Sequence, residues 1–191
     1  MIEEGRPRVL AFAGSLRAGS YNRLALRYAI AGARDAGAEV DEAAADALRL
    51  PLYDGDLEVN GRFPEIVETW RERVRSCDGL LIASPEYNHG MSAVLKNAID
   101  WASRPPNALG GKVAASFGAS PGRLGTARAQ QSLRLTLSAL NVWVVPRTVL
   151  ISSAGTAFDA AGQLKDERQA HDLAALGRTL AAAARAGVGR L

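Results

Sequence analysis

The chain has 191 residues, 48% of them hydrophobic, and its 23 basic and 20 acidic side chains give a net charge of +3. This length and this apolar content predict a single domain over residues 1–191 with one core. Basic and acidic residues are interleaved without a run of lysine or arginine, which argues against a nucleic-acid partner.

The opening residues lack the apolar run of a signal peptide, and no stretch has the length of a membrane helix. We therefore expect a cytoplasmic protein without a membrane partner. Cys77 is the only cysteine, which rules out an internal disulfide, and the two histidines are far apart, so no metal cluster is indicated. We expect Cys77 to be a structural residue next to a strand.

Apolar runs of strand length mark the expected sheet at 8–13, 79–84, 112–118 and 142–151, with a weaker candidate at 39–45. A continuous apolar run is typical of a strand that is buried on both faces. A helix is expected after residue 22, and apolar residues at helical spacing predict four more: Ile66, Val67, Trp70 and Val74; Met91, Val94, Leu95, Ala98, Ile99 and Ala102; Leu133, Leu137 and Leu140; Ala170, Leu173, Ala174, Gly177, Leu180, Ala181 and Ala184. Strands that alternate with helices predict an α/β fold with a parallel sheet.

The long connection at 49–63 holds turn residues and is expected to be a surface loop that could border a pocket.

The first strand is followed by Gly14-Ser15-Leu16-Arg17-Ala18-Gly19-Ser20-Tyr21-Asn22, directly before a helix. Free backbone N–H groups at the helix start, three side-chain donors and one cation would suit an anion such as a phosphate. The same residues would also fit a simple helix cap with Ser20 or Asn22 as the capping residue. A P-loop is excluded because Ser20 stands where its lysine should be, and G-x-G-x-x-G is absent.

Two further loops follow buried strands. Residues 84–90 place Pro85 and Tyr87, which offer flat contact surface, beside several backbone N–H groups, and 117–126 is rich in glycine, which permits close approach to a ligand. Each loop alone would also fit an ordinary turn, and His89 alone is more typical of a surface loop than of a catalytic base. Because parallel strands end at the same edge of a sheet, the three loops together favour a ligand site there.

These motifs resemble the NADPH-dependent FMN reductase family, a group of the flavodoxin-like superfamily that includes small quinone, chromate and azo-dye reductases. The resemblance rests on Gly-Ser-Leu-Arg-x-x-Ser-x-Asn at 14–22, Pro-Glu-Tyr-Asn-His-Gly at 85–90, Lys-Asn-Ala-Ile-Asp-Trp at 96–101 and Ser-Pro-Gly-x-x-Gly at 120–125. It covers nearly the whole chain, and it implies a flavodoxin-like five-stranded parallel sheet of order 2-1-3-4-5 with helices on both faces.

The resemblance also implies a cofactor site. The phosphate of FMN would be held by Ser15, Arg17, Ser20 and Asn22; the isoalloxazine would be lined by Pro85, Glu86, Tyr87 and Asn88, with Gly90 in the same loop and Ser120 and Gly122 on the far side. Thr126 departs from the family pattern, in which a second consecutive glycine is common, and this could narrow the flavin loop.

By the same resemblance, the expected function is that of an NAD(P)H-dependent oxidoreductase with bound FMN. It would reduce quinones, azo compounds, chromate or free flavin with ping-pong kinetics, using NADPH or NADH; Arg123 and Arg104 are candidate contacts to a 2′-phosphate. The alternatives are a flavodoxin-like electron carrier, which is usually acidic, and a non-enzymatic flavin-binding module. The family implies a homodimer or homotetramer, in which Trp70 and Trp101 either face the partner or pack within their own subunit.

Overall fold

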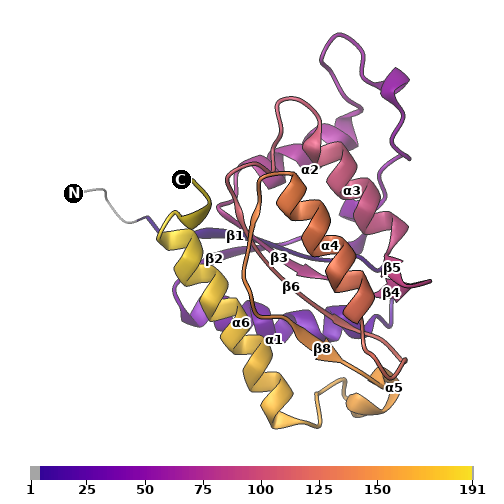
Figure 1. Ribbon diagram of the computed structural model, residues 1–191, viewed down its shortest axis with the longest axis vertical. Helices are drawn as coiled ribbons and strands as arrows, with labels where there is room; N and C mark the ends of the chain where they lie inside the picture. Colours follow the sequence, from indigo (N-terminus) through magenta and orange to yellow (C-terminus); the bar gives the residue numbers. More distant parts are fainter. Residues whose placement is uncertain (1–4, 191) are drawn as a thin grey trace.

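The computed structural model describes residues 5–190 (Figure 1). In chain order the elements are β1 (Arg8–Ala13), α1 (Tyr21–Asp35), β2 (Glu39–Glu42), the 3-10 helices η1 (Ala45–Leu48) and η2 (Gly55–Leu57), α2 (Glu65–Arg75), β3 (Gly79–Ala83), β4 (Glu86–Tyr87), β5 (Gly90–Met91), α3 (Ala93–Ser103), β6 (Val113–Ala119), α4 (Ala127–Ala139), β7 (Trp143–Val144), β8 (Val149–Ile151), α5 (Ala154–Ala157), α6 (Glu167–Arg185) and η3 (Val188–Arg190). The predicted alternation of strands and helices is confirmed.

The main sheet is parallel and has the order β2-β1-β3-β6-β7, which confirms the order predicted from the sequence. Its three central strands are in register, with Phe12 opposite Ile82 and Ile82 opposite Ser116. β2 is an edge strand with mostly exposed residues, which explains why its apolar signal in the sequence is weak. β4 and β5 form a separate antiparallel hairpin at the carboxyl edge of the sheet.

The fifth strand differs from the prediction of one strand over 142–151. It consists of two short pieces, β7 and β8, which both pair with β6. Pro146 lies between them and has no N–H to donate, so the ladder cannot continue through it. The hydroxyl of Thr148 instead donates to the carbonyl of Ser116 at 2.6 Å. A side chain thus replaces one backbone hydrogen bond at the break.

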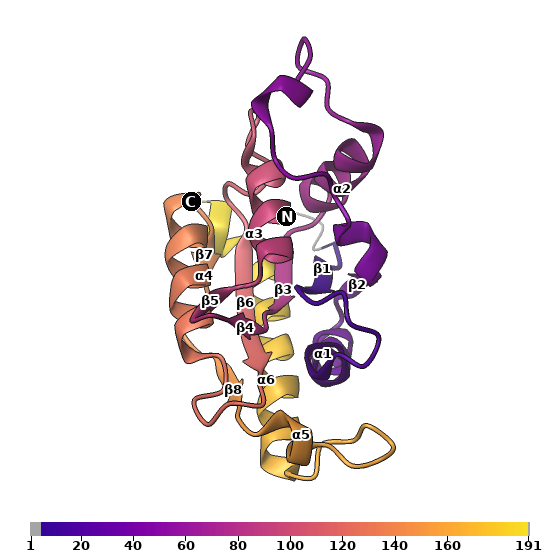
Figure 2. The same cartoon turned by 90° about the vertical axis from the view of Figure 1, so that its right-hand side faces the viewer.

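Helices cover both faces of the sheet, as predicted. α1 and α6 pack on one face with Val9, Ala11 and Leu81, and α2, α3 and α4 pack on the other with Leu10 and Phe12 (Figures 1 and 2). The alternation of β1 residues between the two clusters follows from the two-residue period of a strand. The loops after β1 and β3 lead into α1 and α3. The sheet therefore places the N-terminal ends of these two helices at its carboxyl edge.

The segment between η1 and α2 projects beyond α2 and α3 in both views (Figures 1 and 2). Its base is fixed to α3, because Pro51 accepts hydrogen bonds from Asn97 Nδ2 and Trp101 Nε1, each at 2.8 Å. Trp101 is fully buried, and Trp70, 2% exposed, donates to the carbonyl of Ala98. Of the two alternatives for these tryptophans, a partner surface or packing within their own subunit, the second therefore holds for both.

Cys77 is structural, as expected. It is buried beside α2, and burial raises the pKa of its thiol to about 11, so it stays protonated at neutral pH. Within residues 5–190, no helix combines the length and the hydropathy that crossing a bilayer requires.

Candidate functional site

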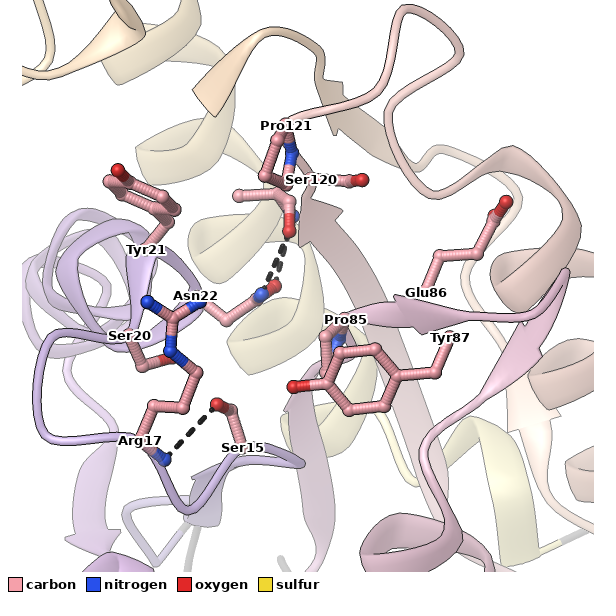
Figure 3. Close-up of a pocket in the computed structure, with 11 residues that line it drawn as sticks. Ser15, Arg17, Ser20, Tyr21, Asn22, Pro85, Glu86, Tyr87, Ser120 and Pro121 are labelled. Atoms are coloured by element: carbon pink, nitrogen blue, oxygen red, sulfur yellow. Dashed lines mark hydrogen bonds between the residues drawn. The ribbon is translucent and has the colours of Figure 1, made fainter. Parts of the chain in front are cut away.

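A pocket lies where the loops after β1, β3 and β6 meet at the carboxyl edge of the sheet (Figure 3). It is lined by Ser15, Arg17, Ser20, Tyr21, Asn22, Pro85, Glu86, Tyr87, Ala119, Ser120 and Pro121. Ligands of open α/β sheets bind at this edge, at the point where the strand order reverses. The reversal here lies between β1 and β3, the strands that carry the first two loops.

The first loop combines hydroxyl groups, a cation and a helix start. Ser20 is the N-cap of α1, and its hydroxyl oxygen accepts from the N–H of Arg23 at 3.4 Å, so the predicted capping role is real. Ser15 and Ser20 are both 4% exposed and line the pocket. The first turn of α1 carries no acidic side chain, so nothing within it offsets the positive end of the helix dipole. Arg17 adds an exposed guanidinium at the same edge.

Asn22 has a structural task in this pocket. Its amide nitrogen donates to the carbonyl of Ala119, and its amide oxygen accepts from the N–H of Ala119, both at 2.9 Å (Figure 3). This pair of bonds joins the start of α1 to the end of β6, so Asn22 fixes the distance between the first and third loops. One N–H of the amide is left for a ligand.

The second loop forms the hairpin of β4 and β5. Tyr87 pairs with Gly90, so Asn88 and His89 make a two-residue turn, and both have positive φ (49° and 67°) as a type I′ turn requires. Tyr87 is about half exposed and presents its ring to the pocket beside Pro85 (Figure 3). The carboxylate of Glu86 points away from this ring and accepts from the N–H groups of Arg128 and Ala129 in α4.

The third loop brings Ser120 and Pro121 to the pocket. Thr126, the departure from the family pattern, does not line it: the side chain is fully buried and packs over Gly118. A Cβ at Gly118 would lie 2.2 Å from both the Ser84 carbonyl oxygen and Thr126 Oγ1, so only glycine fits there. Thr126 thus fills interior space and does not narrow the pocket.

Most of the residues expected at a cofactor site lie together in this pocket. Asn88, Gly90 and Gly122 do not line it: the first two belong to the hairpin, and the carbonyl of Gly122 accepts from the N–H groups of Gly125 and Ser153. The sequence reasoning missed Tyr21, Ala119 and Pro121. Tyr21 lies between Ser20 and Asn22, two residues expected at the site, and this neighbourhood could have indicated that Tyr21 also lines the pocket.

A parallel sheet of this order with a donor-rich pocket at its carboxyl edge defines a flavodoxin-like protein. Residues 7–156 match the family described as NADPH-dependent FMN reductase. The chain is 52% identical to an NAD(P)H-dependent FMN reductase of Pseudomonas aeruginosa over 163 residues, 84% of this chain and 86% of the relative. It is 40% identical to an NADPH:quinone oxidoreductase of Arabidopsis thaliana, covering 84% and 83%.

Among solved structures, the chain is similar to FerB of Paracoccus denitrificans, a flavoenzyme NAD(P)H:(acceptor) oxidoreductase. The TM-score is 0.78 and the identity 31%, with 92% of this chain and 96% of that chain covered. The chain belongs to the NADPH-dependent FMN reductase family. It is therefore an oxidoreductase of a family that uses FMN and NAD(P)H.

The residues of the pocket fit the FMN of this family. A terminal phosphate carries about −1.5 to −2 charges and accepts several hydrogen bonds. The first loop supplies the hydroxyls of Ser15 and Ser20, the guanidinium of Arg17 and the start of α1. The single carboxylate of the lining, that of Glu86, is bound to α4, so the donors face no competing acceptor from it.

Proposed function

We propose that the protein is an NAD(P)H-dependent FMN oxidoreductase that reduces quinones and other small electron-poor acceptors, including azo compounds, chromate and free flavin. The observation that carries the proposal is the donor set at the start of α1: two buried hydroxyls and a guanidinium, with no acid in the first helical turn. The quinone reductases among its relatives support the acceptor class.

The cofactor contacts are assigned by loop. Ser15, Arg17 and Ser20 hold the phosphate, and Asn22 keeps the first and third loops together. Pro85, Tyr87 and Ser120 face the ring, since all three line the pocket. Asn88, Gly90 and Gly122 contribute through the backbone of their turns, because Asn88 and Gly90 belong to the β4–β5 hairpin and Gly122 lies in the loop after β6.

When bound, FMN supplies the acceptance and donation of hydride. The chain therefore needs only to bind and orient the cofactor and its substrates and to exclude water from the site. The backbone N–H groups of 86–90 provide fixed dipoles at the pocket edge. NAD(P)H and the acceptor are proposed to use the same opening in turn. With both concentrations varied, we expect parallel double-reciprocal lines; intersecting lines would contradict a shared opening.

Replacing Arg17 with alanine should weaken FMN binding about 10- to 150-fold. The reason is that a hydrogen bond to a charged group contributes about 1.5 to 3 kcal/mol, and Arg17 brings the cation of the phosphate loop. The measurement is titration of flavin-free protein with FMN, followed by flavin fluorescence.

Arg34→Ala is the matched control, because Arg34 is an exposed arginine in the last turn of the same helix, away from the pocket. It should leave the affinity unchanged. Full FMN affinity in the Arg17 variant would remove the assigned role. Wild-type protein that purifies without flavin and takes up none on addition would contradict the proposed function as a whole.

The discrimination between NADPH and NADH is assigned to Arg123. It is exposed in the third loop beside the pocket, whereas Arg104 lies at the far end of α3 and its Nε contacts Glu58 Oε1 at 2.5 Å. We further propose that residues 1–191 act as one domain, in the cytoplasm, as a homodimer or homotetramer.

A further inference from the structure

The N-terminus of α4 is not capped by its own sequence. Thr126 is the N-cap residue, but its side chain makes no cap hydrogen bond; its Oγ1 instead accepts from Gln130 Nε2 at 3.3 Å. The first turn contains no acidic residue. A helix start leaves backbone N–H groups without intrahelical partners, and these need another acceptor when they are removed from water.

That acceptor comes from the hairpin, 42 residues earlier in the chain. Glu86 Oε2 accepts from the N–H of Arg128 and from the N–H of Ala129, both at 3.0 Å. These are the second and third residues of α4, the donors that an N-cap side chain normally serves. The Glu86 side chain is 12% exposed, and its negative charge lies at the positive end of the helix.

A second contact joins the same two elements. His89 Nδ1 lies 2.8 Å from Arg128 Nη1, and because arginine can only donate, Nδ1 is the acceptor in this contact. Asn88 and His89 hold left-handed backbone conformations that non-glycine residues rarely adopt. The hairpin is therefore held to α4 at its base, through Glu86, and at its tip, through His89.

We propose that Glu86 is a positioning residue whose side chain fixes the 86–90 hairpin against α4, and that its carboxylate does not itself contact the cofactor. While the hairpin is fixed against α4, the side chain of Tyr87 and the backbone of 87–90 stay in one position at the edge of the pocket. Figure 3 shows the Glu86 carboxylate turned away from Tyr87 and from the first loop. The part of this inference that concerns FMN rests on the proposed function.

The test compares Glu86→Ala and Glu86→Gln with wild type. Two quantities are measured: amide hydrogen exchange in the flavin-free protein, and FMN affinity by titration. In Glu86→Ala we expect faster exchange at 128 and 129 and at 87–90, with α6 unchanged, and an FMN affinity about 3- to 30-fold lower, as for loss of a helix cap. Glu86→Gln should restore most of both, because its amide oxygen still accepts from the two N–H groups.

Glu65→Ala is the control, since Glu65 is an acid in the first turn of α2 with an exposed side chain. It should change neither quantity. Unchanged exchange at 87–90 in Glu86→Ala would overturn the proposal. A glutamine variant as impaired as the alanine variant in FMN affinity, with normal exchange, would also overturn it, because the charge would then act on the cofactor directly. Wild-type protein that binds no FMN would contradict the proposed function alone, and exchange at 87–90 would still decide how the hairpin is held.

Discussion

Replacing Arg71 with methionine should lower the free energy of unfolding by about 3 kcal/mol, because four buried or part-buried carbonyl groups would lose a donor, and an unsatisfied buried group costs about 1 to 3 kcal/mol. Arg71 is fully buried. Its Nη1 donates to the carbonyls of Trp101 and Arg104 at 2.7 and 3.0 Å, and its Nη2 donates to those of Pro105 and Pro106 at 3.4 and 3.1 Å.

The position of Arg71 explains why methionine cannot replace it. The Trp101 carbonyl belongs to the last turn of α3, where it also accepts a long hydrogen bond from the N–H of Arg104 at 3.4 Å, and the Arg104 carbonyl belongs to the C-cap residue. The guanidinium also lies 4.2 Å from the centre of the Phe63 ring, a cation–π contact. Burial lowers the pKa of Arg71, while the carboxylate of Glu68 acts in the opposite direction. Arginine stays protonated in proteins, so the site keeps its cation.

Urea unfolding of the variants measures this effect. Arg71→Lys should be intermediate, since an ammonium has three donors in place of five and no planar fork. Arg75→Met, in the last turn of the same helix, removes only an exposed ion pair with Glu72 and should cost less than about 1 kcal/mol. Equal losses in the Arg71 and Arg75 methionine variants would show that the four carbonyls do not depend on the guanidinium.

The sheet and the pocket loops could be predicted because their signals are local. Buried parallel strands appear as short apolar runs, and helix faces as apolar residues three and four apart. The order of the strands and the identity of the cofactor came from the family motifs instead. The prediction of one strand over 142–151 was wrong because Pro146 interrupts the apolar run. The pairing with β6 shows that the strand breaks between β7 and β8.

Contacts between distant residues could not be predicted in this way. Nothing in the sequence indicates that the carboxylate of Glu86, a residue expected at the ring, caps a helix 42 residues away. Arg71 could not be singled out in the sequence, because its acceptors are backbone carbonyls, and every residue type has one of these. The tryptophans follow the same rule: their N–H groups find carbonyls inside the subunit, which the sequence alone does not reveal.

Replacing Gly177 with alanine should lower the free energy of unfolding by about 3 kcal/mol, at the upper end of the usual cost of overpacking. α1 and α6 touch through two glycines. A Cβ at Gly177 would lie 1.9 Å from the Ala29 carbonyl oxygen, and one at Gly32 would lie 2.0 Å from that of Ala174. Both obstacles are helix backbone, so relief requires the helices to separate. The gain of about 1 kcal/mol from replacing a helical glycine offsets only part of this cost.

The same change should also reach the pocket. α1 carries the first loop at its start, and Asn22 ties that start to Ala119 at the end of β6. When α1 and α6 separate, the start of α1 and the third loop no longer keep their spacing, so the affinity for FMN should fall together with the stability. Gly155→Ala is the control, because a Cβ there would meet only Tyr21 Oη at 3.6 Å, an ordinary contact. If thermal unfolding shows Gly177→Ala to be as stable as Gly155→Ala, the close crossing of α1 and α6 is not what holds α1 in place.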